Sequence, residues 1–149
     1  MSLQDQVMQK MKEAMKAKDT NALASLRAIK SEILKAQTES GAKKELSEAD
    51  ELKLLQKLVK QRKDSAAIYQ EQKREDLATP ELEQAKVIES FLPAQMTEAE
   101  IEVEIEKIIA QTKASGMQDM GKVMGLASKQ LAGKADGKTI SMIVKKKLG

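Results

Sequence analysis

The chain has 149 residues, with 26 Lys and Arg against 23 Asp and Glu, and it contains neither His nor Cys. A protein without these two residue types has no thiolate, no Ser-His or Cys-His couple, no disulfide and no Cys/His zinc site. The apolar residues are mostly aliphatic, with nine Met and no Trp, a composition that favours helices over strands.

Uninterrupted apolar runs are far shorter than the roughly 20 residues of a membrane span. Charged residues interrupt the beginning of the chain, so no signal peptide is expected. We therefore expect a cytoplasmic protein that needs no cofactor.

The first half of the chain predicts three helices with recognisable ends. Ser2 is expected to cap a first helix that runs to about Lys16. A second begins near residues 19–20 and runs towards Gly41, a plausible stop. A third and longest helix, about 48–75, carries two adjacent apolar stripes, as expected of a helix packed between neighbours.

Two prolines mark the next boundaries. Thr79-Pro80-Glu81 is the start signal of a fourth helix, with an N-cap, proline at the first helical position and an acid in the first turn. Pro93 disfavours helix in the residue before it and has no backbone donor, so we place a linker there. The chain is thus predicted to be all-α, with an N-terminal four-helix domain, residues 1–92, joined by a Pro linker to a C-terminal domain, residues 97–149.

Three short amphipathic helices are predicted in the C-terminal domain. Thr97 and Glu100 form a capping box that opens the first. The second runs from about 119 to 131, and Asp136 caps the last. The expected architecture is a three-helix bundle.

Positive charge collects at the C-terminal end. Residues 107–149 hold nine Lys against two acidic residues, a formal charge of +7, whereas the whole chain carries +3. Such asymmetry favours a polyanionic partner. The lysines expected to contact nucleic-acid phosphates are Lys122, Lys129, Lys134 and Lys138. The alternative is an ordinary solvated surface, in which the last three lysines complement the negative end of a helix.

Three other patterns leave a structural and a functional interpretation open. Gly121 and Gly125 each cost roughly 1 kcal/mol against alanine inside a helix, which indicates tight helix packing or, as the alternative, approach of a phosphate backbone. Gln61 and Arg62 lie among apolar stripe positions, which predicts either a buried ion pair of Arg62 with an acid such as Glu32, Asp76 or Glu83, or a groove for a ligand or nucleic acid. The methionines serve as core filler or as an adaptable partner surface. The structural interpretation is the favoured one in each case.

Several short motifs lie at residues 57–65, 74–78, 91–93, 120–124 and 133–138. Their order and spacing resemble the YqeY family over essentially the full length. The C-terminal half of that family is similar to the tail domain of the GatB subunit of the tRNA-dependent amidotransferase. This resemblance implies an all-α protein with a helical N-terminal domain and a C-terminal three-helix bundle. In the amidotransferase, the similar tail reaches the tRNA body and helps to hold mischarged tRNA.

The basic end and the resemblance together predict a non-catalytic accessory protein that binds tRNA, or a tRNA-charging or amidotransferase assembly, through its C-terminal bundle. Two alternatives stay open: a protein-protein interaction module whose binding is insensitive to salt, and a component of a glutamine-dependent carbon-nitrogen ligase. The resemblance suggests ligase chemistry with glutamine as amido donor, but no nucleophile is paired with a base, so catalysis by this chain alone stays undecided. Neither a membrane nor a metal ion is an expected partner.

Overall fold

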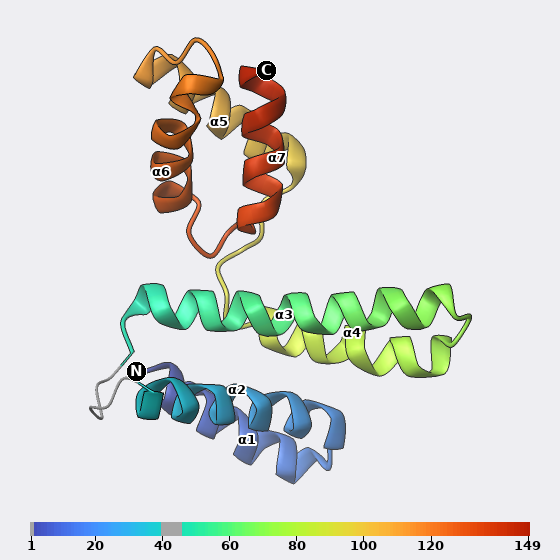
Figure 1. Ribbon diagram of the computed structural model, residues 1–149. Helices are drawn as coiled ribbons and strands as arrows, with labels where there is room; N and C mark the ends of the chain where they lie inside the picture. Colours follow the sequence, from blue (N-terminus) through green and yellow to red (C-terminus); the bar gives the residue numbers. More distant parts are fainter. Residues whose placement is uncertain (1, 40–45) are drawn as a thin grey trace. The chain divides into compact units, whose positions relative to one another are not determined.

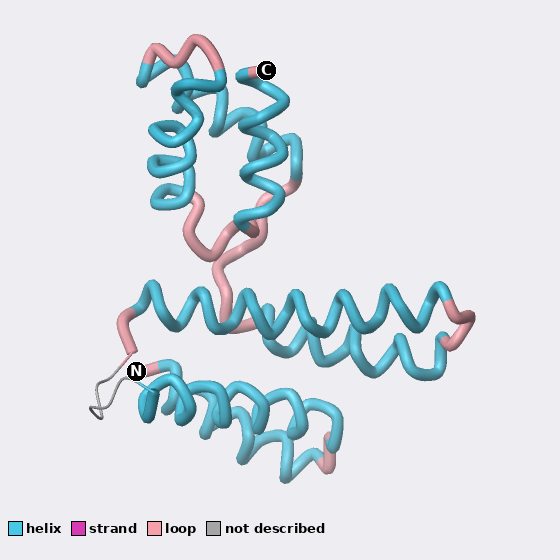
Figure 2. Tube along the Cα trace, in the orientation of Figure 1, coloured by secondary structure: helices cyan, strands magenta, loops and turns pink. Residues whose placement is uncertain are grey.

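A computed structural model describes residues 2–39 and 46–149. The described residues form helices and no strand, which confirms the predicted all-α class (Figures 1 and 2). The chain divides into two compact units, Met1–Leu92 and Pro93–Gly149. The predicted stop of the second helix, Gly41, lies outside the described residues. The elements are α1 (Leu3–Ala17), α2 (Thr20–Glu39), α3 (Glu48–Glu71), α4 (Glu75–Glu89), α5 (Glu98–Thr112), the short 3-10 helix η1 (Met117–Asp119), α6 (Met120–Gln130) and α7 (Gly137–Leu148).

Helices α1 to α4 surround the core of the N-terminal unit, where α3 and α4 form one long antiparallel hairpin (Figure 1). The largest fully buried side chains of this core are Val7, Leu26, Ile29, Leu55 and Ile88, which come from all four helices. Burying an aliphatic side chain of this size contributes roughly 1.5–3 kcal/mol. The four helices are therefore held together by the apolar stripes that their sequences carry.

The junction between α3 and α4 differs from the prediction. Helix α3 ends at Glu71, and α4 already begins at Glu75, so Thr79 and Pro80 lie inside α4 and do not start it. A proline inside a helix removes one backbone hydrogen bond. The turn before Pro80 belongs to the long hairpin with α3, and its Ala78 is fully buried, which favours helix on the N-terminal side of Pro80.

A polar network, rather than the predicted buried ion pair, joins α3 to α4 and α2. The half-buried Arg62 donates from Nε to Oε1 of Gln84 at 3.2 Å. Gln84 donates to Oδ1 of Asn21 at 2.9 Å, and Asn21 donates to Oε2 of Glu83 at 3.1 Å. Gln61 is exposed. Arg62 is held by the neutral amide of Gln84 and forms no ion pair among the described residues, so the favoured ion-pair interpretation is wrong, although the role is still structural.

Helices α5, α6 and α7 enclose the core of the C-terminal unit, with Ile105, Ile108, Val123 and Val144 among its buried side chains. The predicted caps are confirmed. Thr97 and Glu100 form both hydrogen bonds of a capping box at the start of α5, and the Asp136 side chain accepts from the Thr139 backbone N–H at the start of α7. These local signals fix where two of the three helices begin.

The methionines are less buried than predicted. Met11, Met96, Met120 and Met124 are partly buried and pack against the cores. Four others are exposed by 43% or more, so the core-filler interpretation is wrong for these: Met8, Met15, Met117 and Met142.

Candidate nucleic-acid interface

Part of the basic end is used to hold the C-terminal unit together. Lys147 of α7 donates to Oε1 of Glu106 on α5 at 2.7 Å, and Lys146 lies 3.6 Å from Oε1 of Glu102. The hydrogen bond from Lys147 to Glu106 raises the pKa of Lys147. Lys107 pairs with a glutamate of its own helix. These three lysines therefore neutralise acids of α5, a pairing that neither interpretation of the basic end predicted.

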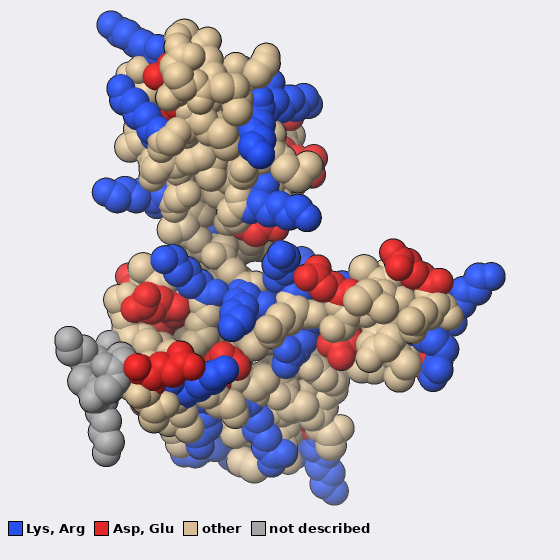
Figure 3. Space-filling view, in the orientation of Figure 1, with Lys and Arg blue, Asp and Glu red and all other residues tan. Residues whose placement is uncertain are grey.

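The remaining lysines of this end face solvent without an acidic partner in the described part of the chain. Figure 3 shows lysine side chains projecting from the C-terminal unit. All four lysines expected to contact phosphates belong to this group. Their charge is available to an external anion because no carboxylate of the unit neutralises it. The group comprises Lys113, Lys122, Lys129, Lys134, Lys138 and Lys145.

The four predicted lysines occupy two places in the unit. Lys122 and Lys129 lie on α6, seven residues apart, so they share one side of the helix at a separation of about 10 Å along its axis. Lys134 lies in the connection between α6 and α7, and Lys138 in the first turn of α7. A cation near a helix N-terminus is unfavourable to the helix dipole. Lys138 thus has a position that its own helix does not favour.

The connection that carries Lys134 is fixed by the segment that precedes α5. Gln95 donates from Nε2 to the carbonyl of Gly133 at 2.7 Å, and the Met96 N–H donates to the carbonyl of Lys134 at 2.9 Å. Gly133 has φ 76°, a left-handed conformation that glycine adopts without strain. From the sequence, residues 95 and 96 are predicted only as linker, because no local pattern reveals a contact between segments so distant in sequence.

Gly121 and Gly125 do not serve tight packing within this chain. A Cβ atom added at either position would meet no atom within 4 Å, and both residues are exposed. The favoured tight-packing interpretation is therefore wrong. Because Gly121, Gly125 and Lys129 are spaced by four residues, they follow one another along the exposed side of α6, with Lys122 beside them. This side of α6, which we call the glycine face, allows an external molecule to reach the helix backbone between two lysines.

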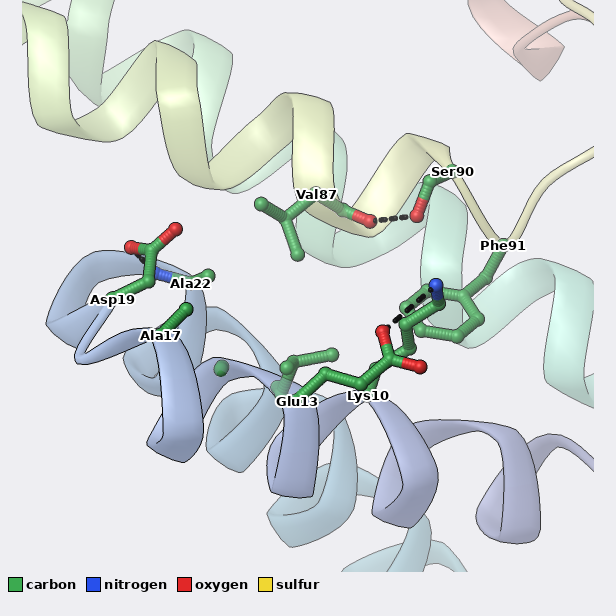
Figure 4. Close-up of a pocket in the computed structure, with 10 residues that line it drawn as sticks. Lys10, Glu13, Ala17, Asp19, Ala22, Val87, Ser90 and Phe91 are labelled. Atoms are coloured by element: carbon green, nitrogen blue, oxygen red, sulfur yellow. Dashed lines mark hydrogen bonds and ion pairs between the residues drawn. The ribbon is translucent and has the colours of Figure 1, made fainter.

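A groove in the N-terminal unit combines an apolar lining with four polar side chains that already have partners. It has a volume of about 240 Å³ and lies between α1, the start of α2 and the end of α4 (Figure 4). Its polar side chains already have partners: Lys10 pairs with Glu13, Asp19 accepts from the Ala22 N–H, and Ser90 donates to a backbone carbonyl. The remaining lining is largely aliphatic or aromatic. The groove therefore suits an apolar group, because the carboxylates, the amine and the hydroxyl that line it already have partners.

The described residues form neither a metal site nor a membrane span. His, Cys, Asp and Glu side chains do not gather there in a group of three that would hold a metal ion. Among the helices described, none combines the length and the apolar character that crossing a bilayer requires.

The fold and the surface define a class of all-α proteins in which a helical N-terminal unit is followed by a compact unit with exposed lysines. The profile of one family, described as Yqey-like protein, matches residues 4–148. The chain belongs to this family.

Two fungal relatives match most of the chain and are named altered inheritance of mitochondria protein 41, mitochondrial. The protein from Kluyveromyces lactis is 33% identical over 135 residues, which are 89% of this chain and 68% of that protein. The protein from Clavispora lusitaniae is 35% identical over 108 residues, 70% of this chain and 61% of that protein. The chain therefore spans about two thirds or less of these relatives.

A shorter match links the chain to a tRNA-dependent enzyme. A glutamyl-tRNA(Gln) amidotransferase subunit from Thermococcus gammatolerans is 38% identical over 73 residues. The match covers 46% of this chain but only 12% of that subunit. The shared segment supports the amidotransferase resemblance, although most of the subunit has no counterpart here.

Proposed function

We propose that this protein is a non-catalytic accessory that binds tRNA through the exposed lysines of its C-terminal unit, with Lys122, Lys129, Lys134 and Lys138 as phosphate ligands. The observation that carries the proposal is the division of lysines in this unit. Those that face α5 are paired with glutamates, whereas these four have no acidic partner in the described chain. Unpaired exposed cations release the counterions of a polyphosphate on binding, which is the main source of non-specific affinity.

Two features of the C-terminal unit, one on α6 and one at the start of α7, favour a phosphate backbone over a protein partner. Glycines at 121 and 125 cost helix stability and gain no contact within the chain, a cost that close approach of an external backbone explains. Lys138 lies at the N-terminal end of α7, where backbone N–H groups and the helix dipole attract an anion. An anion bound there offsets the unfavourable position of Lys138.

The protein partner that goes with this proposal is a tRNA-charging or amidotransferase assembly. Its basis is the segment shared with a glutamyl-tRNA(Gln) amidotransferase subunit. The proposed compartment is the cytoplasm, as the sequence predicts, although two relatives are named as mitochondrial proteins. Cell fractionation with a tagged full-length chain tests the location, and co-sedimentation with the organelle fraction would contradict it.

A tRNA titration at several salt concentrations tests the proposal. Glutamine at all four lysines should weaken binding and make the slope of log K against log salt shallower by up to about 4, one for each lost phosphate contact. The matched control removes the same charge from the N-terminal unit, with glutamine at Lys53, Lys57, Lys60 and Lys86, which are exposed and lack an ion-pair partner among the described residues.

The control variant separates a specific surface from general electrostatic attraction. It should keep most of the affinity and nearly the original salt slope. Equal losses for both variants would show that only the net charge matters and would overturn the assignment. A DNA duplex of equal charge, added as competitor, should displace tRNA poorly if the surface recognises the folded RNA.

The ligase alternative predicts a different result. A component of a glutamine-dependent carbon-nitrogen ligase would release ammonia from glutamine, alone or on addition of an amidotransferase. We expect no glutaminase activity from the pure chain, because the sequence contains neither Cys nor His, and the Thr97 hydroxyl that contacts the Glu100 carboxylate belongs to the N-cap of α5. Measurable activity of the pure protein would refute a non-catalytic role.

A further inference from the structure

The α1–α2 pair of the N-terminal unit exposes apolar side chains that no packing explains. Met8 is 43% exposed, Met15 is 53% exposed, and Leu34 is 45% exposed. Met11 and Leu23 are partly buried against the core. We call these five residues, three on α1 and two on α2, the outer seam. Exposed apolar side chains that gather in one place mark an interaction surface more often than isolated ones do.

Helix geometry places the three methionines together on α1. Met8, Met11 and Met15 follow one another at spacings of three and four, so they lie on one side of the helix. Lys10 and Glu13 line the groove towards α4 (Figure 4). At 100° per residue these two lie on the opposite side of α1 from the methionines. The methionine stripe therefore faces away from α4.

The leucines of α2 lie on the corresponding side of that helix. Asn21 faces α4, because its amide donates to the Pro80 carbonyl and to Glu83. Leu23 and Leu34 are eleven residues apart, about three turns, so they share a side of α2 nearly opposite Asn21. Both stripes thus flank the α1–α2 pair on the side away from α4, and Arg27 and Lys30 interrupt the stripe of α2 between its two leucines.

Cations border the outer seam. Lys12 follows Met8 by one turn on α1, and Arg27 and Lys30 lie between the two leucines along α2. None of the three forms an ion pair among the described residues, and they outnumber Asp5, the exposed acidic residue one turn before Met8 on α1. Figure 3 shows Lys and Arg side chains along the edge of the N-terminal unit that α1 and α2 form.

We propose that the outer seam is a docking site for an acidic amphipathic helix of a partner protein. An apolar stripe on such a helix would cover the methionines and leucines, while its flanking carboxylates would meet Lys12, Arg27 and Lys30. Methionine suits this task because its flexible thioether adapts to different apolar surfaces. The apolar centre favours a helix over RNA, since phosphates gain nothing from covering Met8 and Met15.

The acidic helix α5 of a second copy fits this site less well. Three of its glutamates, Glu102, Glu104 and Glu106, already pair with lysines of their own unit. Their charge is largely neutralised, so charge complementarity points to a helix of another protein. This site is separate from the lysines proposed to bind tRNA.

The methionine methyl groups allow a direct test on the full-length chain. The probe is a synthetic 18-residue helical peptide with leucine along one side and glutamate on both flanks. A second peptide carries lysine in place of every glutamate. In the NMR spectrum of methyl-labelled protein, the acidic peptide should shift Met8, Met11 and Met15 saturably and leave Met117 and Met142, on the other unit, unchanged.

Affinity measurements on variants then test each part of the seam. The acidic peptide should bind at least tenfold more tightly than the basic peptide at low salt. M8Q together with M15Q should weaken it about tenfold, whereas the control M117Q with M142Q should not. All four methionines are exposed, so the variants should fold alike, which circular dichroism checks. The variant K12E should weaken the acidic peptide and strengthen the basic one.

Four results would overturn the proposal. They are no saturable shift with the acidic peptide, equal affinity for both peptides, equal shifts at Met117 and Met142, and an unchanged affinity in the double variant. Binding of tRNA or of vesicles containing phosphatidylglycerol at these methyls, without binding of the acidic peptide, would likewise assign the seam to RNA or to lipid instead. If the pure protein self-associates and M8Q with M15Q abolishes this self-association, the outer seam would be assigned to a second copy.

Discussion

Replacing Gly125 by alanine should raise stability and lower tRNA affinity at once. The residue lies inside α6, where alanine is favoured over glycine by about 0.8–1.0 kcal/mol. A Cβ atom at this position meets nothing within 4 Å, so no clash opposes the gain. Gly121 is equally open but is the second residue of α6, and we expect a smaller gain there.

The size of the effect on binding follows from the glycine face. If an RNA backbone reaches α6 between Lys122 and Lys129, a methyl group at 125 pushes it outwards. A charge-assisted hydrogen bond contributes about 1.5–3 kcal/mol, so weakening one of them should cost about tenfold or more in affinity. The same substitution thus changes stability and binding in opposite directions.

Hydrogen exchange and a tRNA titration measure the two effects separately. Exchange at the buried amides of Val123 and Ala127 reports the unfolding free energy of α6, and a gain of about 1 kcal/mol slows it about fivefold. Ser128, exposed on the same side of α6, provides the control S128A, which adds no bulk and should leave affinity nearly unchanged.

Two results would refute this reasoning. A loss of stability in G125A would mean that the space beside Gly125 is filled in the native protein. A gain in stability with unchanged tRNA affinity would mean that no backbone approaches the glycine face. The second result would remove one of the two supports for RNA binding there.

Three further predictions concern the packing, caps and ion pairs. Ile105→Ala should destabilise the C-terminal unit by about 2–5 kcal/mol and Thr97→Ala by about 1 kcal/mol, measured by urea denaturation; equal costs would contradict the core assignment. The hydrogen bond from Arg74 lowers the pKa of Asp76 in the folded protein. The ionised Asp76 therefore stabilises the fold above about pH 3.9, the usual pKa of an unfolded Asp. This stabilisation is lost as the pH falls through the lower pKa of the folded protein. An NMR titration should show that Arg74→Gln returns this pKa to its usual range, and an unchanged midpoint would contradict the assignment. Lys147→Gln should destabilise the protein slightly at low salt and not at about 1 M salt, where exposed pairs are screened; a salt-independent loss would point to packing instead.

Local signals in the sequence determine much of the helical order. Ser2, Thr97 and Asp136 cap helices where the sequence predicts them, because a cap needs only its own side chain and a backbone N–H three residues on. The apolar spacing likewise predicts the buried sides of the helices, since the helix period alone decides which residues share a side. The helical class of the protein follows from these short-range rules.

Other features are decided by contacts between distant segments. Pro80 has the local signature of a helix start, yet it lies inside α4, because packing of the preceding turn outweighs one lost hydrogen bond. The glycines of α6 look the same in sequence whether they face another helix or solvent, and only the structure shows that they face solvent.

The candidate interface is divided in the same way. The sequence alone determines that lysines gather at the C-terminal end. Which of them are neutralised depends on α5 lying beside α7, which brings Glu106 to Lys147 across 41 residues of sequence. Charge is a property of each residue, whereas its pairing is a property of the fold, because Coulomb attraction depends on distances that only the tertiary structure fixes.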